Sequence, residues 1–154
     1  MPSAILSKYG TATAFTKTLA SLANATGRQT TIVDNTTARF SRLIIHAKIT
    51  LGTSPTANRG IYFYLIRDDG EATPLRSDGA GASDAALTPL NSQLLGALST
   101  GTAPATGTVL TGDFIVDEPG KKFGAIIFND SGVALNATEA NHVVEYIGVN
   151  PENQ

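Results

Sequence analysis

The chain contains no cysteine and no tryptophan, and only 16% of its 154 residues are charged. The absence of cysteine excludes disulfide bonds and thiolate chemistry. With 11 basic and 13 acidic residues, the formal net charge is −2. A chain so sparsely and evenly charged has no general electrostatic attraction for nucleic acid or for an anionic membrane. We therefore expect neither of these among its partners.

Long hydrophobic runs are also missing. No stretch approaches the ~18 apolar residues that a membrane-spanning helix requires. The N-terminus lacks the charged start and apolar run of a signal peptide, so we expect a product made in the cytoplasm. Hydrophobic residues still make up 42% of the chain, enough for one domain with a full hydrophobic core. The low charge gives little repulsion between copies, which favours a protein that works in an assembly.

The hydrophobic pattern that is present has a period of two. In the segment 38–52 (ARFSRLIIHAKITLG), every second residue from Leu43 to Leu51 is apolar, with mostly polar residues between them. This alternation predicts a β-strand with one dry face and one wet face. We predict that the strand crosses the middle of a sheet. We also predict that it pairs antiparallel with the very apolar strand 61–67 (IYFYLIR), because a short loop joins the two.

The rest of the chain alternates between short β-rich segments and turns rich in glycine, proline, asparagine and aspartate. These segments cover residues 13–20 (with a short helix as the alternative), 28–33, 94–98 (a strand or one helical turn), 109–116 (with a glycine bulge), 123–128 and 141–149. The pattern predicts an all-β protein, an antiparallel β-sandwich of the jelly-roll type with seven or eight strands. We divide it into an N-terminal arm (1–12), one domain (13–150) and a polar tail (151–154).

No catalytic or metal-binding motif stands out. His46 and His142 lie at polar positions of predicted strands and could bind a metal with Glu145. Their spacing matches no metal motif, and we interpret both as ordinary surface or hydrogen-bonded residues. No G-x-S-x-G sequence surrounds any serine. We predict that the protein is not an enzyme, with no catalytic residue, no metal site and no cofactor.

Three other features have both a functional and a structural interpretation. Asp68-Asp69-Gly70 and Asp78-Gly79 resemble parts of calcium loops, but the full spacing is missing and Asp-Gly is common turn chemistry. The glycines of Asp78–Asp84 (DGAGASD) could cradle phosphate, but without a P-loop lysine we favour a flap or subunit contact. Tyr62 and Tyr64 share a strand face and could form a sugar-binding platform. The alternative is that the second sheet or a neighbouring subunit covers this face.

Two stretches of the sequence together resemble a known group of proteins. One is IYFYLIRDDG, followed after a spacer by SDGAGASDAAL and NSQLLGAL, and the other is KKFGAIIFNDSGVALNATEANHVVEYIGVNPE. Their order and texture over residues 38–154 resemble small β-sandwich virion proteins of tailed bacteriophages, of the kind that decorate or cement capsids. The resemblance implies a structural protein without enzymatic residues, often a trimer at the symmetry axes of the shell. No individual functional residue carries over from it.

From these observations we predict a virion structural protein, a capsid decoration or cement protein that stabilises the shell by binding the capsid lattice. Its partners would be the major capsid protein or other virion proteins. It would be a homo-oligomer, such as a trimer, in the virion. The binding residues are unknown, although the N-terminal arm and the loop Asp78–Asp84 are expected to make contacts. The main alternative is a carbohydrate- or receptor-binding β-sandwich module of a phage tail, and an enzyme is the third.

Overall fold

A computed structural model describes residues 5–153 of the chain. Of the predicted arm and tail, residues 1–4 and 154 lie outside the described residues. In the described part of the chain, the regular structure is β apart from two short 3-10 helices, η1 (Ser77–Gly79) and η2 (Glu139–Asn141). Within the described residues, no helix combines the length and hydrophobicity needed to cross a membrane.

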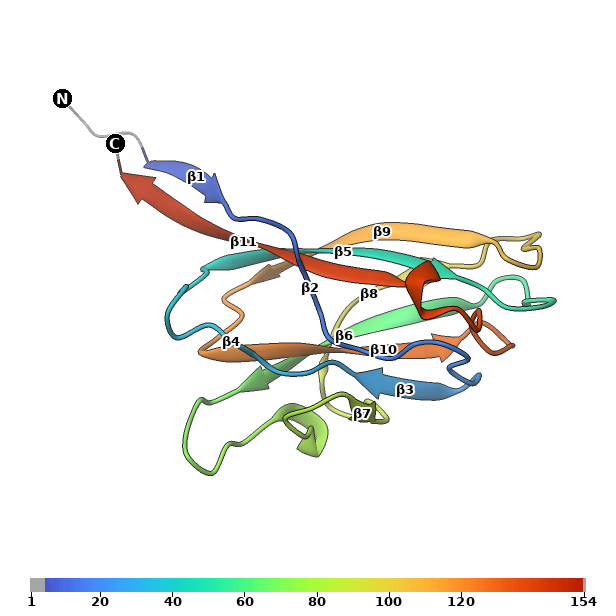
Figure 1. The fold of residues 1–154 in the computed structure, drawn as a ribbon, viewed down its shortest axis with the longest axis horizontal. Helices are drawn as coiled ribbons and strands as arrows, with labels where there is room; N and C mark the ends of the chain where they lie inside the picture. Colours follow the sequence, from blue (N-terminus) through green and yellow to red (C-terminus); the bar gives the residue numbers. More distant parts are fainter. Residues whose placement is uncertain (1–4, 154) are drawn as a thin grey trace.

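Eight strands of four residues or more form two sheets that face each other in Figure 1. They are β1 (Ile5–Tyr9), β3 (Thr26–Gln29), β5 (Arg42–Thr50), β6 (Gly60–Asp68), β8 (Gln93–Ser99), β9 (Val109–Asp117), β10 (Lys122–Asp130) and β11 (Val143–Asn153). Three two-residue strands add to the sheets: β2 (Thr13–Ala14), β4 (Val33–Asp34) and β7 (Ala85–Ala86).

The order of the strands defines the fold. The first sheet, called here the arm sheet, runs β1-β11-β5-β9, with β2 also paired to β11. The second, called the flap sheet, runs β7-β3-β10-β6-β8, with β4 also paired to β10. All the pairings are antiparallel. The two sheets face each other, and the chain passes back and forth between them, as in a jelly roll. The predicted antiparallel β-sandwich is confirmed.

The strand predicted to cross the middle of a sheet does so. β5 lies between β11 and β9 in the arm sheet. All five apolar residues of its alternating pattern are buried: Leu43, Ile45, Ala47, Ile49 and Leu51. The wet face carries Arg42, His46 and Lys48, which are exposed or partly exposed. The two-residue period of the sequence therefore maps directly onto the two faces of the strand.

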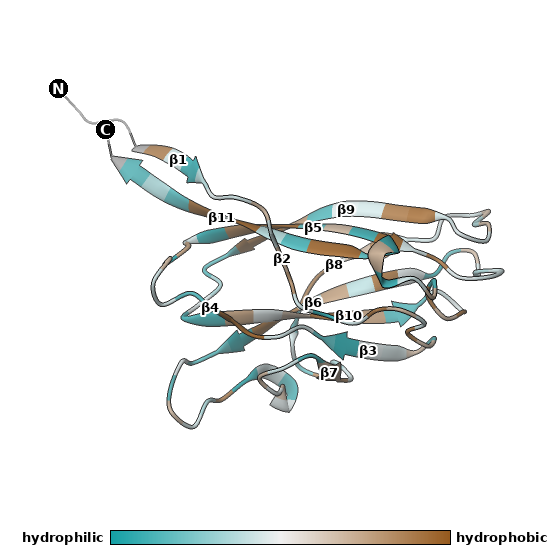
Figure 2. Ribbon diagram, viewed as in Figure 1, coloured by the Kyte–Doolittle hydropathy of each residue, from teal (hydrophilic) through white to brown (hydrophobic). Residues whose placement is uncertain are grey.

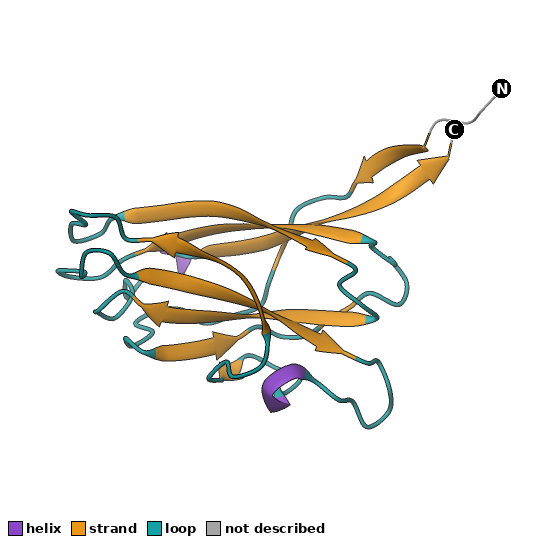
Figure 3. Cartoon of the chain, turned by 180° about the vertical axis from the view of Figure 1, so that it is seen from behind, coloured by secondary structure: helices purple, strands orange, loops and turns teal. Residues whose placement is uncertain are grey.

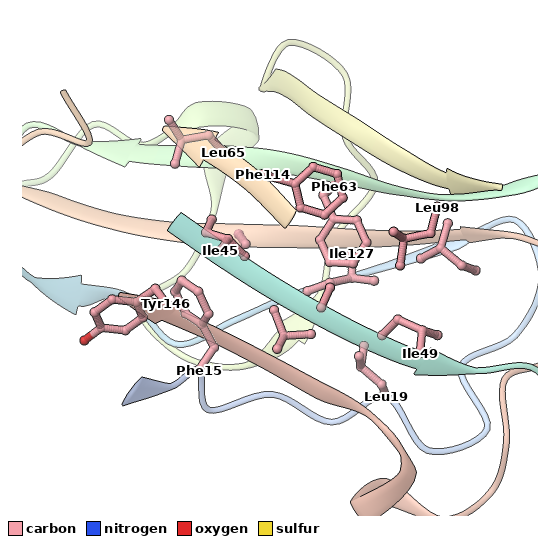
Figure 4. Close-up of a cluster of buried hydrophobic side chains, with 14 of the residues drawn as sticks. Phe15, Leu19, Ile45, Ile49, Phe63, Leu65, Leu98, Phe114, Ile127 and Tyr146 are labelled. Carbon is pink, nitrogen blue, oxygen red and sulfur yellow. The ribbon is translucent and has the colours of Figure 1, made fainter. Parts of the chain in front are cut away.

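The predicted pairing of this strand with the next one is wrong. β6 belongs to the flap sheet, where it lies between β10 and β8. The loop 51–59 crosses from one sheet to the other, a distance of about 10 Å that a loop of this length spans easily. Both strands present large apolar side chains to the same core from opposite sheets, and Figure 4 shows Ile45 and Phe63 among them.

The segment predicted as a strand at 13–20 is regular only at Thr13–Ala14. Beyond that point it passes from one sheet to the other. The Phe15 N–H donates to the Val144 carbonyl of the arm sheet, and the Thr16 carbonyl accepts from Thr31 beside the flap sheet. Phe15 and Leu19 are buried along the crossing. Phe15 packs against Tyr146 with ring centroids 4.9 Å apart, so the segment closes the core along one side.

The glycine bulge predicted within 109–116 is absent. β9 pairs with β5 over nine consecutive residues without a shift. The irregularity lies in β8, where the register with β6 shifts between Phe63 and Tyr64. Gly112 has a packing role instead, because a Cβ there would lie 2.6 Å from Leu98 Cδ2. The glycine allows Leu98, from the edge of the flap sheet, to approach the edge of the arm sheet.

The last strand is longer than predicted. It continues past Val149 to Asn153, so residues 151–153 of the predicted tail are part of β11. Their partner is β1, formed by part of the predicted arm. Beyond the end of β5, these two strands form a two-stranded ribbon that projects from one end of the sandwich (Figure 3). Figure 2 shows hydrophobic stretches along β5, β9 and β11 within the sandwich and a hydrophilic tip of β11 in the ribbon.

Candidate functional site

The outer face of the arm sheet carries an apolar row across three strands, called here the isoleucine row. Ile147, Ile44 and Ile115 are consecutive partners in the registers of β11, β5 and β9. Ile115 is 65% exposed, and Val109 on the same strand is 53% exposed. Aliphatic side chains aligned on a regular sheet face form a surface that another protein can cover without rearranging it.

Charged rows flank this apolar row. On one side, Glu145, His46 and Asp113 are consecutive partners, and His46 Nδ1 lies 2.5 Å from Asp113 Oδ1. On the other side, Arg42 Nε donates to Asp117 Oδ1 at 2.5 Å. A shallow depression of about 440 Å³ lies over the first row. The face therefore combines an apolar centre with charged borders, as protein interfaces do.

The histidine pair considered as a metal site is not assembled. His46 and Glu145 are opposite each other, but His142 is buried elsewhere. Its Nε2 lies 2.9 Å from the Asn136 carbonyl oxygen, and its Nδ1 lies 3.4 Å from the Thr50 nitrogen. Within residues 5–153, no three metal-ligating side chains are grouped to hold an ion. Burial lowers the pKa of His142, so its neutral form suits this position.

The end of the sandwich that carries the ribbon also holds two adjoining hollows. One, of about 510 Å³, lies between the segments 35–41 and 118–121. Asn35 shapes it, because its side chain accepts from the Phe40 N–H and donates to the Phe40 and Gly120 carbonyls. The other, of about 390 Å³, lies at the base of the ribbon and includes Leu6 and Pro151. The ribbon and this end of the sandwich thus form one continuous uneven surface.

The loop Asp78–Asp84 is anchored to the protein itself. The Asp78 carboxylate accepts hydrogen bonds from the backbone N–H groups of Leu90, Asn91 and Ser92 at 2.6–3.0 Å. Burial alone raises the pKa of Asp78, but the hydrogen bonds from this segment outweigh it and lower the pKa to about 2. These charge-assisted hydrogen bonds hold together the two halves of the segment 71–92, called here the flap.

The other aspartates considered as calcium ligands are also engaged within the chain. Asp68 is buried, and its Oδ2 accepts from Arg76 Nε at 2.5 Å. Asp69 Oδ1 accepts from the Glu71 N–H at 3.1 Å. Asp84, at the end of the glycine loop considered for phosphate, accepts from Arg28 Nε at 2.5 Å and from the Thr18 hydroxyl. The turn interpretation of Asp68-Asp69-Gly70 agrees with the Gly70 N–H, which donates back to Asp68 at 2.7 Å.

The tyrosines considered as a sugar platform lie on the outer face of the flap sheet. Tyr62 is opposite Phe128 and Tyr64 is opposite Ile126 in the register with β10. Both tyrosines are half-buried, and on the other side Tyr64 is next to Leu94, which is 52% exposed. The prediction that they share a face is confirmed. The second sheet does not cover them, because it packs on the opposite face of β6.

Comparisons with known proteins assign the chain to no family. No protein-family model, curated protein or solved structure matches it. The functional interpretation therefore depends on the fold and on the surfaces described above. Of these, the isoleucine row and the ribbon were not predicted from the sequence. The alternation of Val109, Thr111, Asp113 and Ile115 carried a signal for the former, because it places two aliphatic side chains on the wet face of a strand.

Proposed function

We propose that the chain is a non-enzymatic virion structural protein of a tailed bacteriophage, of the capsid decoration or cement type. The observation that carries this proposal is the projecting ribbon of β1 and β11. A two-stranded ribbon is marginally stable in water unless something packs on it. This ribbon extends beyond the sandwich and leaves Leu6 47% and Tyr9 63% exposed. Contacts with other protein subunits on the two faces of the ribbon would cover these side chains.

The fold supports the proposal by analogy. Jelly rolls occur in viral capsid and lectin domains, among others. The fold agrees with the resemblance of residues 38–154 to small virion proteins of tailed phages. It also agrees with the low charge of the chain, because closely packed copies on a shell would repel each other if they carried a large net charge.

The isoleucine row offers the means of binding. Burial of apolar surface contributes about 25 cal/mol per Å². Even a modest contact of this kind becomes strong when many copies bind one lattice and several contacts are made at once. The major capsid protein or another virion protein is the proposed partner. The ribbon and the isoleucine row are the two surfaces that would meet it or a neighbouring copy.

The location of the chain in virus particles tests the proposal. An antibody against the chain, carried on gold, is applied to particles purified from the source of the gene. We expect label spread over the capsid. Label confined to the tail tip would favour a receptor-binding role, and particles without label would rule out a virion protein. Cross-linking of the particles with mass spectrometry should then connect this chain to the major capsid protein.

A second candidate function is carbohydrate or receptor binding by a phage tail module. The observation that favours it is the half-buried pair Tyr62 and Tyr64 on the outer face of the flap sheet, since aromatic faces stack on sugar rings. A glycan array with the wild-type chain tests it, and Tyr62→Ala should abolish any binding. Ile115→Ala, on the opposite sheet, is the control that should keep it. No bound glycan would count against this function.

A further inference from the structure

Within residues 5–153, the edge of the arm sheet at β9 is open. In this part of the chain, β9 pairs with β5 alone. At one end of this pairing the Glu118 N–H donates to the Ser41 carbonyl, and at the other the Leu51 N–H donates to the Thr108 carbonyl. Backbone groups of an antiparallel strand point alternately to the two sides. Even-numbered residues of β9 therefore bond to β5, and the free edge presents the N–H and C=O groups of Thr111, Asp113 and Ile115.

This edge carries few of the devices that usually protect an edge strand. The pairing with β5 is free of bulges over nine residues, and the strand (VLTGDFIVD) contains neither proline nor lysine. Its charges are two aspartates, and both side chains are engaged by β5, through His46 and Arg42. Arg67 covers only the last carbonyls, those of Asp117 and Glu118. The edge is ready to accept another strand.

Among the described strands, none pairs with the outer side of β1, so the opposite edge of the same sheet is open as well. The Gly10 N–H donates to the Gly148 carbonyl, which sets the phase of the β1–β11 pairing. Even-numbered residues of β1 bond to β11, so the backbone groups of Ser7 and Tyr9 point outward. The other side of the ribbon is blocked, because Pro151, opposite Ser7, has no N–H to offer. The ribbon can therefore extend a sheet only through β1.

The two open edges match in direction and in face. Strand direction alternates along β1-β11-β5-β9, so a second copy that continues the sheet in the same orientation brings its β1 antiparallel to β9. Opposed residues of an antiparallel pair project to the same face. Ser7 and Tyr9 share the face of Pro151 and Val149, the outer face. The exposed residues of β9 are on that face too. An antiparallel register that pairs the free backbone groups of the two edges therefore also keeps the outer faces of the two copies on the same side.

We propose that β1 of one copy adds to the β9 edge of a second copy, so that the arm sheet continues from subunit to subunit. Pairing of β9 with a second β9 would bring four aspartates together, and their like charges would repel each other. The only charged residue of β1 is Lys8, which is already paired with Glu152 at 3.0 Å. The contact is heterologous, because it joins two different surfaces, and it closes into a ring if the rotation permits. The inference rests on the proposed function, a virion protein that works as an assembly. It identifies the contact between neighbouring subunits of that assembly.

Two proline variants test the proposal. Ser7→Pro removes a free N–H from β1, and Thr111→Pro removes one from β9, while the bonds within each subunit remain. Ser7→Ala and Thr111→Val change the same side chains and keep the N–H groups. Light scattering after gel filtration gives the mass of each. We expect wild type and both control variants to form one oligomer. Both proline variants should be monomers that keep the wild-type circular dichroism and unfold cooperatively, at a lower midpoint because the subunit contact is lost.

Mixing the proline variants is the decisive step. Thr111→Pro keeps a usable β1 and Ser7→Pro keeps a usable β9, so the mixture should form a dimer with one copy of each and nothing larger. Assembly of Ser7→Pro alone would indicate β9–β9 pairing, and assembly of Thr111→Pro alone would indicate β1–β1 pairing. Either result, a mixture that stays monomeric, or a monomeric wild type overturns the proposal. Because no virus particle is involved, this outcome is independent of the labelling experiment.

Discussion

Lys17 and Glu139 are 122 residues apart in the sequence, and Lys17 Nζ lies 2.6 Å from Glu139 Oε1. The other carboxylate oxygen of Glu139 accepts from the backbone N–H groups of Leu19 and Ala20 at 2.6 and 2.7 Å. Burial raises the pKa of Glu139, but these donors outweigh it and the net pKa falls below its ordinary value. One side chain therefore holds the crossing segment to η2 and closes the core at Leu19.

Replacement of this carboxylate should destabilise the sandwich. We expect Glu139→Gln to lower the free energy of unfolding by about 1–3 kcal/mol, because hydrogen bonds to a charged acceptor are lost and Lys17 keeps no anion. Urea unfolding measures the change. The matched control is Glu152→Gln, which breaks an exposed pair with Lys8 and should cost less than about 1 kcal/mol. Equal losses in both variants would contradict this role.

The flap should be sensitive to Asp78. Asp78→Asn removes the charge that receives three N–H groups, a loss of about 1.5–3 kcal/mol that increases opening of the flap about tenfold or more. Limited proteolysis within 71–92 measures it. Asp69→Asn is the control, since asparagine can also accept the one bond from the Glu71 N–H. The pKa of Asp78 is about 2, below the ordinary 3.8, so wild-type protection should persist above pH 4 and fade towards pH 2.

His142 should make the fold sensitive to mild acid. Its pKa is lowered by burial, so the unfolded chain binds a proton more readily than the folded chain. Stability is then complete above the ordinary pKa of 6.5 and decreases as the pH falls from there towards the folded pKa. Thermal midpoints measured between pH 7.5 and 5 should show this decrease. His46→Asn should retain it, whereas His142→Gln, less stable throughout, should show a flatter profile. Identical slopes would contradict this.

Gly148 should not tolerate a side chain. A Cβ added at this position would overlap the ring of Phe40, which packs over β11 and lines the hollow at the ribbon end. We expect Gly148→Ala to cost about 1–3 kcal/mol, as overpacking does. Gly81→Ala is the matched control, because its Cβ would meet Gln29 Nε2 at an ordinary 3.6 Å. Unfolding midpoints of the two variants should therefore differ clearly.

The sequence predicted the elements of this fold better than their arrangement. The alternation in β5 reports burial on one face, and burial of Leu43, Ile45 and Ile49 followed directly. Which strand lies beside β5 depends on whether the loop 51–59 turns within a sheet or crosses to the other, and both paths suit its length and composition. The pairing of β5 with β6 was wrong for that reason.

Local pattern also failed where contacts are long-range. Residues 15–20 have strand-like composition, but their backbone groups bond to Val144 in the arm sheet and to Thr31 beside the flap sheet, which no local pattern reveals. The polar residues 151–153 have weak strand propensity, and only their pairing with β1 makes them part of a strand. The candidate surfaces were missed for the same reason. The isoleucine row requires three strands in one register, and the open edges are visible only after the sheets are assembled.

The position of β11 in the arm sheet has a consequence for biosynthesis. β11 is the strand that β1, β2 and β5 all pair with, and it is the last of the described strands in chain order. Until its residues have been synthesised, β5 lacks one neighbour and β1 has no partner at all. Of the described pairings in the arm sheet, only that of β5 with β9 can form before β11 emerges from the ribosome. Completion of the sheet is therefore a late event, and until then the apolar face of β5 depends on the flap sheet or on chaperones for protection.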